Sequence, residues 1–162
     1  MHALALGEDD REVETDGDSK SISSEHTFDV DTADIDQIKS CLLEQCEEVG
    51  SRLRQEKVAA RTVQLKLRYA DFTTLTRRRT LPHPTQDEMT LYEVAGQLLA
   101  AEQIAGKRVR LIGVGGTNLV VPEVQIDLFE HTDEKRTRLA KAVDELRGKL
   151  GPGAIKRGTS LK

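Results

Sequence analysis

Basic residues in the middle of the chain are the ones best suited to chemistry, and that chemistry is the binding of phosphate. Lys66 and Arg68 are two positions apart, and three consecutive arginines, Arg77 to Arg79, follow further along. Arg108 and Arg110 repeat the two-residue spacing. Ammonium and guanidinium groups form charge-assisted hydrogen bonds with phosphate oxygens. Because side chains two residues apart share one face of a strand, several of these cations are predicted to lie on one sheet surface.

Other chemistries find little support among the residues. There is no Ser-His-Asp arrangement, no Walker-type glycine-rich loop and no Cys/His cluster with the spacing of metal ligands. Cys41 and Cys46 lie five residues apart on a predicted helix, which turns them away from each other. We interpret both as buried or half-exposed thiols, with metal binding as a weaker alternative. The sequence therefore predicts no catalytic residue, no metal site and no cofactor in this chain.

The charge is distributed unevenly along the chain. The formal net charge is −4, yet residues 1 to 56 carry 16 acidic and 5 basic residues, whereas residues 57 to 80 carry 7 basic residues and one acidic residue. Such a basic block is the electrostatic footprint expected of a surface that binds a polyanion, and the obvious polyanion is a nucleic-acid backbone.

Length and hydropathy limit the class of protein. With 162 residues, 37% of them hydrophobic and only 3% aromatic, the chain is predicted to form one domain with a mostly aliphatic core. It contains no apolar run of about 20 residues and no signal-peptide pattern at its start. These features favour a cytoplasmic protein.

Alternating polar and apolar residues predict the strands that position the cations. Residues 58 to 69 alternate with a period of two, which is typical of a half-buried strand. A second strand is expected from Phe72 to Leu81, joined to the first by a short turn and ended by Pro82 and Pro84. Further strands are expected over residues 20 to 28 and 107 to 121.

Apolar residues three or four positions apart predict the helices. The first should begin near Ala33, after turn and cap residues at Asp29 to Asp31. The second should open with a capping box of Thr85 and Glu88 and end near Gly106. The last should begin at Thr132 or Asp133 and end at residues 151 to 153, with one apolar face made of Leu139, Val143, Leu146 and Leu150.

The predicted order β-α-β-β-α-β, followed by a C-terminal helix, indicates an α+β fold: a four-stranded sheet with helices packed on one face. The other face is then open to water. It should carry Lys66, Arg68, part of the Arg77 to Arg79 run, and Arg108 or Arg110. Phosphate binding is the interpretation we favour for this face, and an ordinary solvated polar face is the alternative.

Four segments resemble a known family, in the family's order. Residues 61 to 77 resemble the central hairpin of the little finger domain of Y-family translesion DNA polymerases, and residues 109 to 114 resemble its last strand. Residues 20 to 28 resemble the strand that links the thumb to the little finger, and residues 7 to 13 resemble the end of the thumb. The chain is thus similar to the little finger of bacterial Y-family polymerases of the DNA polymerase IV type.

This resemblance implies three regions: an acidic thumb-end segment, expected to be flexible, over residues 1–19, a little finger domain over 20–129, and a C-terminal helical tail over 130–162. It also implies that the sheet grips primer-template duplex DNA by its phosphates, without reading sequence. A register shift of one residue would reverse the faces of Arg77 to Arg79, so which of the three faces DNA stays open. The DNA contacts that the resemblance implies are Lys20, Ser21, Ser23, Lys66, Arg68, Thr74, Thr76, Arg77 and Arg110.

A short peptide resembles the motif by which bacterial polymerases dock on the sliding clamp. It comprises Gln125, Ile126, Asp127, Leu128 and Phe129. In such a motif, Leu128 and Phe129 anchor in an apolar pocket while Gln125 forms hydrogen bonds at its rim. The alternative is an ordinary loop whose two apolar residues pack inward, and the helical tail that follows leaves open that the motif is masked.

Y-family catalysis uses carboxylates of the palm to hold two magnesium ions, and nothing in this chain resembles the palm or the fingers. The resemblance therefore implies that the chain alone is catalytically inert and that its partners are DNA, the sliding clamp and the remaining thumb, palm and fingers. The start within a thumb-like segment suggests a fragment or a truncated reading frame. The alternative is a free-standing regulatory protein that binds the clamp and has no polymerase activity.

Overall fold

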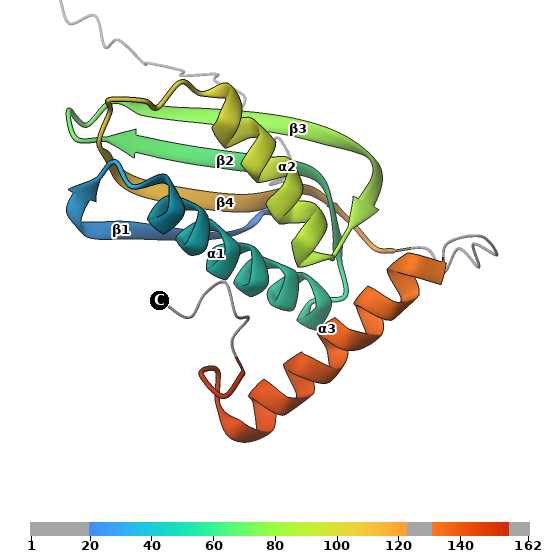
Figure 1. The fold of residues 1–162 in the computed structure, drawn as a ribbon. Coiled ribbons are helices and arrows are strands. Elements are labelled where there is room, and N and C mark those ends of the chain that lie inside the picture. The colour runs from blue at the N-terminus through green and yellow to red at the C-terminus, as the bar shows by residue number, and fades with distance from the viewer. Residues whose placement is uncertain (1–19, 123–130, 156–162) are drawn as a thin grey trace, which may run out of the picture.

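The structure is a computed structural model that describes residues 20–122 and 131–155 (Figure 1). The predicted order of strands and helices is confirmed. The elements are β1 (Ile22–Thr32), α1 (Ile35–Gln55), β2 (Ala59–Tyr69), β3 (Thr74–Thr85), α2 (Glu88–Ala101), β4 (Val109–Val120) and α3 (His131–Leu150).

The four strands form one antiparallel sheet in the order β1-β4-β2-β3. The helices α1 and α2 lie side by side across one face of this sheet, and within the described residues no helix lies on the opposite face (Figure 1). The predicted α+β fold, with helices on one face of a four-stranded sheet, is confirmed. We call the face without helices the open face and the other the covered face.

The core lies between the covered face and the two helices, and it is almost entirely aliphatic. Alternate residues of β2, namely Val63, Leu65 and Leu67, are fully buried against Ile38 and Leu42 of α1 and against α2. Burying a side chain of this size contributes about 1.5–3 kcal/mol. This packing explains why apolar and polar residues alternate along β2.

The first helix begins later than its predicted cap. The segment Asp29 to Asp31 was expected to form a turn, but it belongs to β1. The cap is Asp34, whose carboxylate accepts hydrogen bonds from the N–H groups of Asp36 at 2.9 Å and Gln37 at 3.3 Å. A carboxylate at this position satisfies amide groups that have no partner inside the helix.

The prediction that Pro82 and Pro84 end the third strand is wrong, because β3 continues to Thr85. β3 lies at the edge of the sheet, so its outer side forms no ladder hydrogen bonds that a proline could remove. The cap of α2 is Asp87 rather than Thr85, and its carboxylate accepts a hydrogen bond from the Thr90 N–H at 2.8 Å. The helix ends at Ala101, before Gly106.

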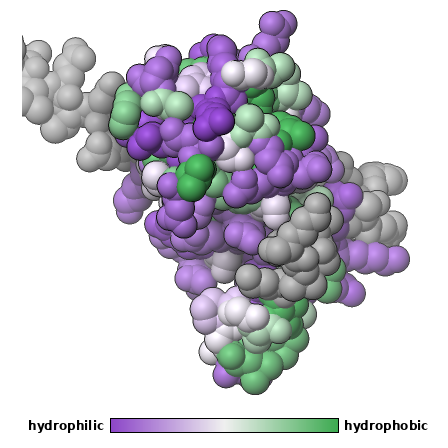
Figure 2. Space-filling view, turned by 60° about the vertical axis from the view of Figure 1, so that its left-hand side comes forward, coloured by the Kyte–Doolittle hydropathy of each residue, from purple (hydrophilic) through white to green (hydrophobic). Residues whose placement is uncertain are grey.

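The last helix is present as predicted, but its apolar face is not part of the core. Leu139, Leu146 and Leu150 are 61%, 43% and 69% exposed, and among residues 135–150, whose side chains the structure describes, only Ala140 is buried. Figure 2 shows hydrophobic residues gathered at the lower end of the molecule, where α3 lies. Within the described residues, no helix is both long enough and apolar enough to cross a membrane.

Candidate nucleic-acid interface

The register of the hairpin decides which side chains reach the open face. In the pairing of β2 with β3, Lys66 lies opposite Thr76 and Arg68 lies opposite Thr74. Gln64 lies opposite Arg78 in the same ladder. Paired residues point to the same side of a sheet. The side chains of these three pairs therefore lie on the same face, which is the open face.

Lys66, Arg68 and Arg78 form a row of cations on this face, and each is held by a neighbour. The Lys66 ammonium pairs with Glu25 of β1 at 2.8 Å. The Nε of Arg68 donates to the hydroxyl of Thr74 at 2.8 Å, and the Nε of Arg78 donates to the Gln64 amide oxygen at 2.8 Å. These bonds hold the cations at defined positions across β2 and β3.

Glycines in β4 leave the centre of the open face without side chains. A Cβ atom at Gly113 would lie 2.7 Å from the Cγ of Glu25, and one at Gly115 would lie 3.0 Å from the Cβ of Ser23. Both contacts point to the open side, since Ser23 pairs with Gly115 and Glu25 with Gly113. Bare backbone at these positions lets a large ligand approach closely.

A shallow depression of about 520 Å³ lies beside these glycines. Its lining is rich in hydroxyl and amide groups, including a pair in which the Thr62 hydroxyl accepts from the Asn118 amide at 2.9 Å. Such groups suit phosphate and sugar oxygens. The lining residues are Ser21, Ser23, Thr62, Gln64, Arg78, Thr80, Gly115, Thr117 and Asn118.

Arg77 does not lie on the open face. It pairs with Leu65, and Arg79 pairs with Val63, two residues that are fully buried under the helices. Both arginines therefore point toward α2, where Arg77 forms an ion pair with Glu102 and Arg79 donates to Gln97. The expectation that Arg77 accompanies Lys66 on one surface is wrong, because the strand's period of two selects Arg78.

The end of the open face holds Arg110, which the sequence also singled out. Its Nη2 lies 3.1 Å from a carboxylate oxygen of Asp31, and its guanidinium carbon lies 4.4 Å from the centre of the Phe72 ring. Arg108 lies just before β4, where its carbonyl accepts from the Ala70 N–H at 2.9 Å. Arg110 is thus separate from the row formed by Lys66, Arg68 and Arg78.

The linker residues reach the same surface from the side of β1. Ser23 is exposed opposite Gly115, Ser21 lines the depression, and Lys20 is exposed just before the strand. Sequence reasoning left out Gln64 and Thr80, and it could not choose Arg78. The position of Thr80 follows from the length of the β2–β3 turn, which periodicity alone does not supply. All of these DNA contacts stay predictions.

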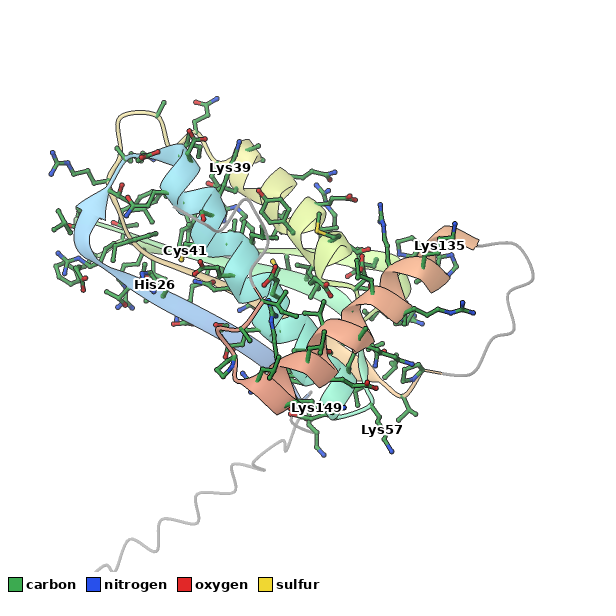
Figure 3. The ribbon with its side chains drawn as sticks, turned by 60° about the horizontal axis from the view of Figure 1, so that its bottom comes forward. His26, Lys39, Cys41, Lys57, Lys135 and Lys149 are labelled. Atoms are coloured by element: carbon green, nitrogen blue, oxygen red, sulfur yellow. The ribbon has the colours of Figure 1, made fainter. Side chains whose placement is uncertain are left out.

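The cysteines are unsuited to nucleophilic chemistry. Burial, reinforced by the nearby charge of Glu44, raises the pKa of the Cys41 thiol to about 11. Burial also raises the pKa of Cys46. A thiolate, not a thiol, is the nucleophile and the metal ligand. Cys41 and His26 come from different elements, α1 and β1 (Figure 3), and the described residues contain no group of three His, Cys, Asp or Glu side chains placed to hold a metal ion.

Two predicted features lie outside the described residues. These are the acidic segment 1–19 and the peptide Gln125 to Phe129. The peptide lies between Pro122, just after β4, and His131, the first residue of α3.

Comparison with known proteins identifies relatives over most of the chain. Residues 19–128 match the model described as the impB/mucB/samB family C-terminal domain. DNA polymerase IV of Caulobacter vibrioides is 42% identical over 163 residues, which cover 100% of this chain and 40% of that protein. DNA polymerase IV 1 of Mesorhizobium japonicum is 38% identical over 160 residues, which cover 98% and 36%. The chain thus spans about two fifths of the length of these curated relatives.

Solved structures share the fold at low sequence identity. The complex of the beta-clamp processivity factor and the little finger domain of PolIV matches with a TM-score of 0.53 and 20% identity, over 69% of this chain and 99% of that one. DinB from Sulfolobus solfataricus matches with a TM-score of 0.53 and 20% identity, over 63% and 29%. Both likenesses place the sheet and its two covering helices in the little-finger fold.

Proposed function

The chain belongs to the impB/mucB/samB family of C-terminal domains and has the little-finger fold of Y-family polymerases, and we propose that it grips primer-template duplex DNA with its open face. One observation carries this proposal: the hairpin register aligns Lys66, Arg68 and Arg78 beside hydroxyl groups and bare glycine backbone. DNA polymerase IV is the name of the curated relatives, and the polymerase context of this chain is part of the proposal.

The cations of the open face can exchange their present partners for phosphate at low cost. Exposed ion pairs contribute about 0–1 kcal/mol, so Lys66 can leave Glu25 when a phosphate approaches. Arg68 and Arg78 each use Nε for an internal bond, and among the described residues their Nη atoms have no hydrogen-bond partner. These Nη groups are therefore available to phosphate oxygens.

The contacts offered by this face suit a duplex of any sequence. Threonine hydroxyls, backbone amides and cations bind the sugar-phosphate backbone, which carries no direct sequence information. In the row formed by Lys66, Arg68 and Arg78, one carboxylate, that of Glu25, pairs with a cation, so the row is positive although the whole chain is negative. A domain that follows a polymerase along its template needs such sequence-independent binding.

Fluorescence anisotropy of a labelled primer-template duplex tests the proposal. Nonspecific binding has dissociation constants on the order of 10⁻⁴ to 10⁻⁶ M at physiological salt and tightens at low salt. The double variant Lys66→Ala/Arg78→Ala should lose most of this affinity. Its matched control is Arg77→Ala/Arg79→Ala, which removes the same number of charges from the other face of the sheet.

Two results would contradict the duplex-binding proposal. The first is no binding by the unaltered chain even at low salt. The second is an equal loss of affinity in both double variants, because the binding would then follow total charge rather than the open face.

We further propose that Gln125 to Phe129 dock on a sliding clamp. The proposal is supported by the resemblance of the peptide to clamp-binding motifs and by the solved little finger that is in complex with a beta-clamp. The variant Leu128→Ala/Phe129→Ala should abolish binding to the clamp and leave duplex affinity unchanged. Clamp binding by a chain with no affinity for DNA would favour a free-standing clamp-binding regulator.

Catalysis is assigned by this proposal to parts of the polymerase outside the chain. Palm carboxylates of the parent protein would hold the magnesium ions that phosphoryl transfer requires. The chain alone should give no primer extension in the presence of magnesium and nucleotides. Extension that persists after purification to homogeneity would contradict this assignment.

A further inference from the structure

The turn between β2 and β3 presents an exposed aromatic ring in an unusual backbone conformation. Phe72 has a φ of 65° and is 64% exposed. This left-handed region is uncommon for a bulky residue, and residues held in it concentrate at functional sites. The turn is fixed in this shape, since the Phe72 N–H donates to the Tyr69 carbonyl at 2.9 Å and the Thr73 N–H donates to the Asp71 carboxylate at 2.9 Å.

The ring is supported from one side by a guanidinium group. The guanidinium carbon of Arg110 lies 4.4 Å from the centre of the Phe72 ring, and Asp31 holds Arg110 by an ion pair of 3.1 Å. Three segments that are distant in the sequence thus meet at this point. Because Arg110 supports the ring and Asp31 supports Arg110, the position of the ring is preorganised.

This group belongs to the open side of the sheet. Val109 is fully buried on the covered side and pairs with Thr32 of β1. Asp31, next to Thr32, is therefore directed to the open side. The register of β4 shifts at this point, because the open-side Arg68 pairs with Leu111 and Tyr69 pairs with Val109, so Arg110 lies in the bulge between these two pairs and reaches Asp31. Arg68 and Thr74, on either side of the turn, lie on the same side. The ring of Phe72 thus lies at the end of the proposed duplex-binding surface.

We propose that Phe72 and Arg110 form a platform on which an unpaired base of the DNA stacks, next to the duplex held by the open face. The inference rests on the proposed DNA-binding function and adds a second ligand group, the nucleobase, to the phosphates. Aromatic rings and guanidinium planes bind unpaired bases by stacking, and they do so with little regard to base identity.

The surroundings of Phe72 favour a base over an apolar protein partner. Protein docking sites are contiguous apolar patches. The other large exposed apolar residues near this end are Val30 and Ile35. The alternation of β1 turns Val30 away from Asp31 to the opposite side, and Ile35 begins α1, which lies on the covered face. The neighbours of the platform are instead cationic, with Arg68 on the open face and Lys107 5.0 Å from the Tyr69 ring. Cations beside one isolated ring suit a base attached to a phosphate backbone.

The platform is tested with three DNA ligands that share one duplex: a blunt form, a form with unpaired bases at either end, and a form whose overhang is abasic. Anisotropy with the full chain at fixed salt should show that the overhang with bases binds about fivefold or more tighter than the abasic one. This increment should disappear in Phe72→Leu, which keeps apolar bulk but has no aromatic face. It should persist in Phe72→Trp and in the control Val30→Ala.

The outcomes separate this inference from the function on which it rests. Equal affinity for the two overhangs, with normal binding of the blunt duplex, would overturn the platform alone. The platform is also overturned if Phe72→Leu keeps the increment, or if it instead weakens binding to the clamp, because the ring would then contact protein. Absence of blunt-duplex binding at low salt would overturn the proposed function and the platform with it. The circular-dichroism spectrum and the thermal unfolding of Phe72→Leu establish that the variant is folded.

Discussion

On the open face of β3, Arg78 has one bond to Gln64 and extends into a surface of hydroxyls and glycine backbone. On the covered face, its neighbours Arg77 and Arg79 are engaged with Glu102 and Gln97, which come from the α2 region. The three residues are consecutive and chemically identical. The difference between them teaches that strand register, not residue type, decides whether a cation is available to a ligand or anchors the fold.

The covered side uses charges for structure most clearly at Arg54. Its guanidinium lies 2.8 Å from Glu88 of α2 and 2.7 Å from Asp144 of α3, and its side chain is 9% exposed. Burial lowers the pKa of Arg54, but the hydrogen bond with Asp144 and the charge of Glu88 raise it by more, so the group stays charged. With the ion pair between Arg147 and Glu47, this junction holds α3 against α1.

The largest expected effect is therefore on stability and belongs to the covered side. In Arg54→Ala, the carboxylates of Glu88 and Asp144 would remain in a largely buried site without the positive charge of the guanidinium group. Loss of one member of a buried ion pair costs about 3–5 kcal/mol. Urea denaturation should show this loss. The control Arg78→Ala should change the free energy of unfolding by less than about 0.5 kcal/mol, as is usual for surface positions. Equal losses of stability in Arg54→Ala and Arg78→Ala would contradict the difference between the two faces.

Two adjacent glycines of β4 provide a matched pair for the same contrast. A Cβ at Gly116 would lie 2.6 Å from the Cβ of Ala60 on the covered side. Overpacking of this kind costs about 1–3 kcal/mol, so Gly116→Ala should lower the melting temperature. A Cβ at Gly115 would lie 3.0 Å from the Cβ of the exposed Ser23 and 3.5 Å from the carbonyl oxygen of Ile22. Gly115→Ala should therefore lower the melting temperature less than Gly116→Ala does, and it should weaken duplex binding. If calorimetry showed a lower melting temperature for Gly115→Ala than for Gly116→Ala, the assignment of the two glycines to the open and covered faces would be wrong.

Single charge removals should sharpen the comparison within β3. Arg78→Ala should weaken duplex binding and reduce the slope of log K against log salt by about 1, the change expected for one lost phosphate contact. Arg79→Ala should leave that slope unchanged. Anisotropy titrations at several salt concentrations measure both, and a change of slope in Arg79→Ala would show that the covered side also meets DNA.

The smallest expected effect is chemical and concerns the half-buried thiol of Cys41. Because burial raises its pKa to about 11, alkylation by iodoacetamide at pH 8 should be much slower in the folded chain than in the urea-unfolded chain. A folded pKa above the ordinary value of about 8.5 stabilises the fold fully below that pH. This contribution should be lost as the pH rises toward about 11. Equal alkylation rates would contradict the burial of Cys41.

The patterns that predicted elements correctly are those in which one side of an element packs on the core. The alternation in β2 and the three-four spacing in α1 both reflect burial that the structure confirms at Val63, Leu65 and Ile38. Prediction was wrong where position in the sheet overrides local preference. Pro82 and Pro84 continue β3 because it is an edge strand. For α3, the sequence predicted the helix and its apolar stripe; the structure leaves most of that stripe exposed, and ion pairs of Asp144 and Arg147 hold the helix.

The candidate site was predictable as a region but not residue by residue. The sequence singled out Lys66, Arg68 and the arginine triplet, and the open face carries the first two. The choice of Arg78 depends on the β2–β3 turn, whose residue count sets the register. The platform at Phe72 was not predicted, because it brings together the distant residues Asp31 and Arg110.

The sequence by itself determined the order of strands and helices, the aliphatic core, the basic block within an acidic chain and the family resemblance. These properties depend on local periodicity and composition, which one chain read from end to end contains. Only the tertiary structure decided which face each arginine occupies, where the glycines of β4 expose backbone, and which side chains meet at Phe72. The physical reason is that a strand's faces are set by pairing with other strands, and one residue of register reverses them.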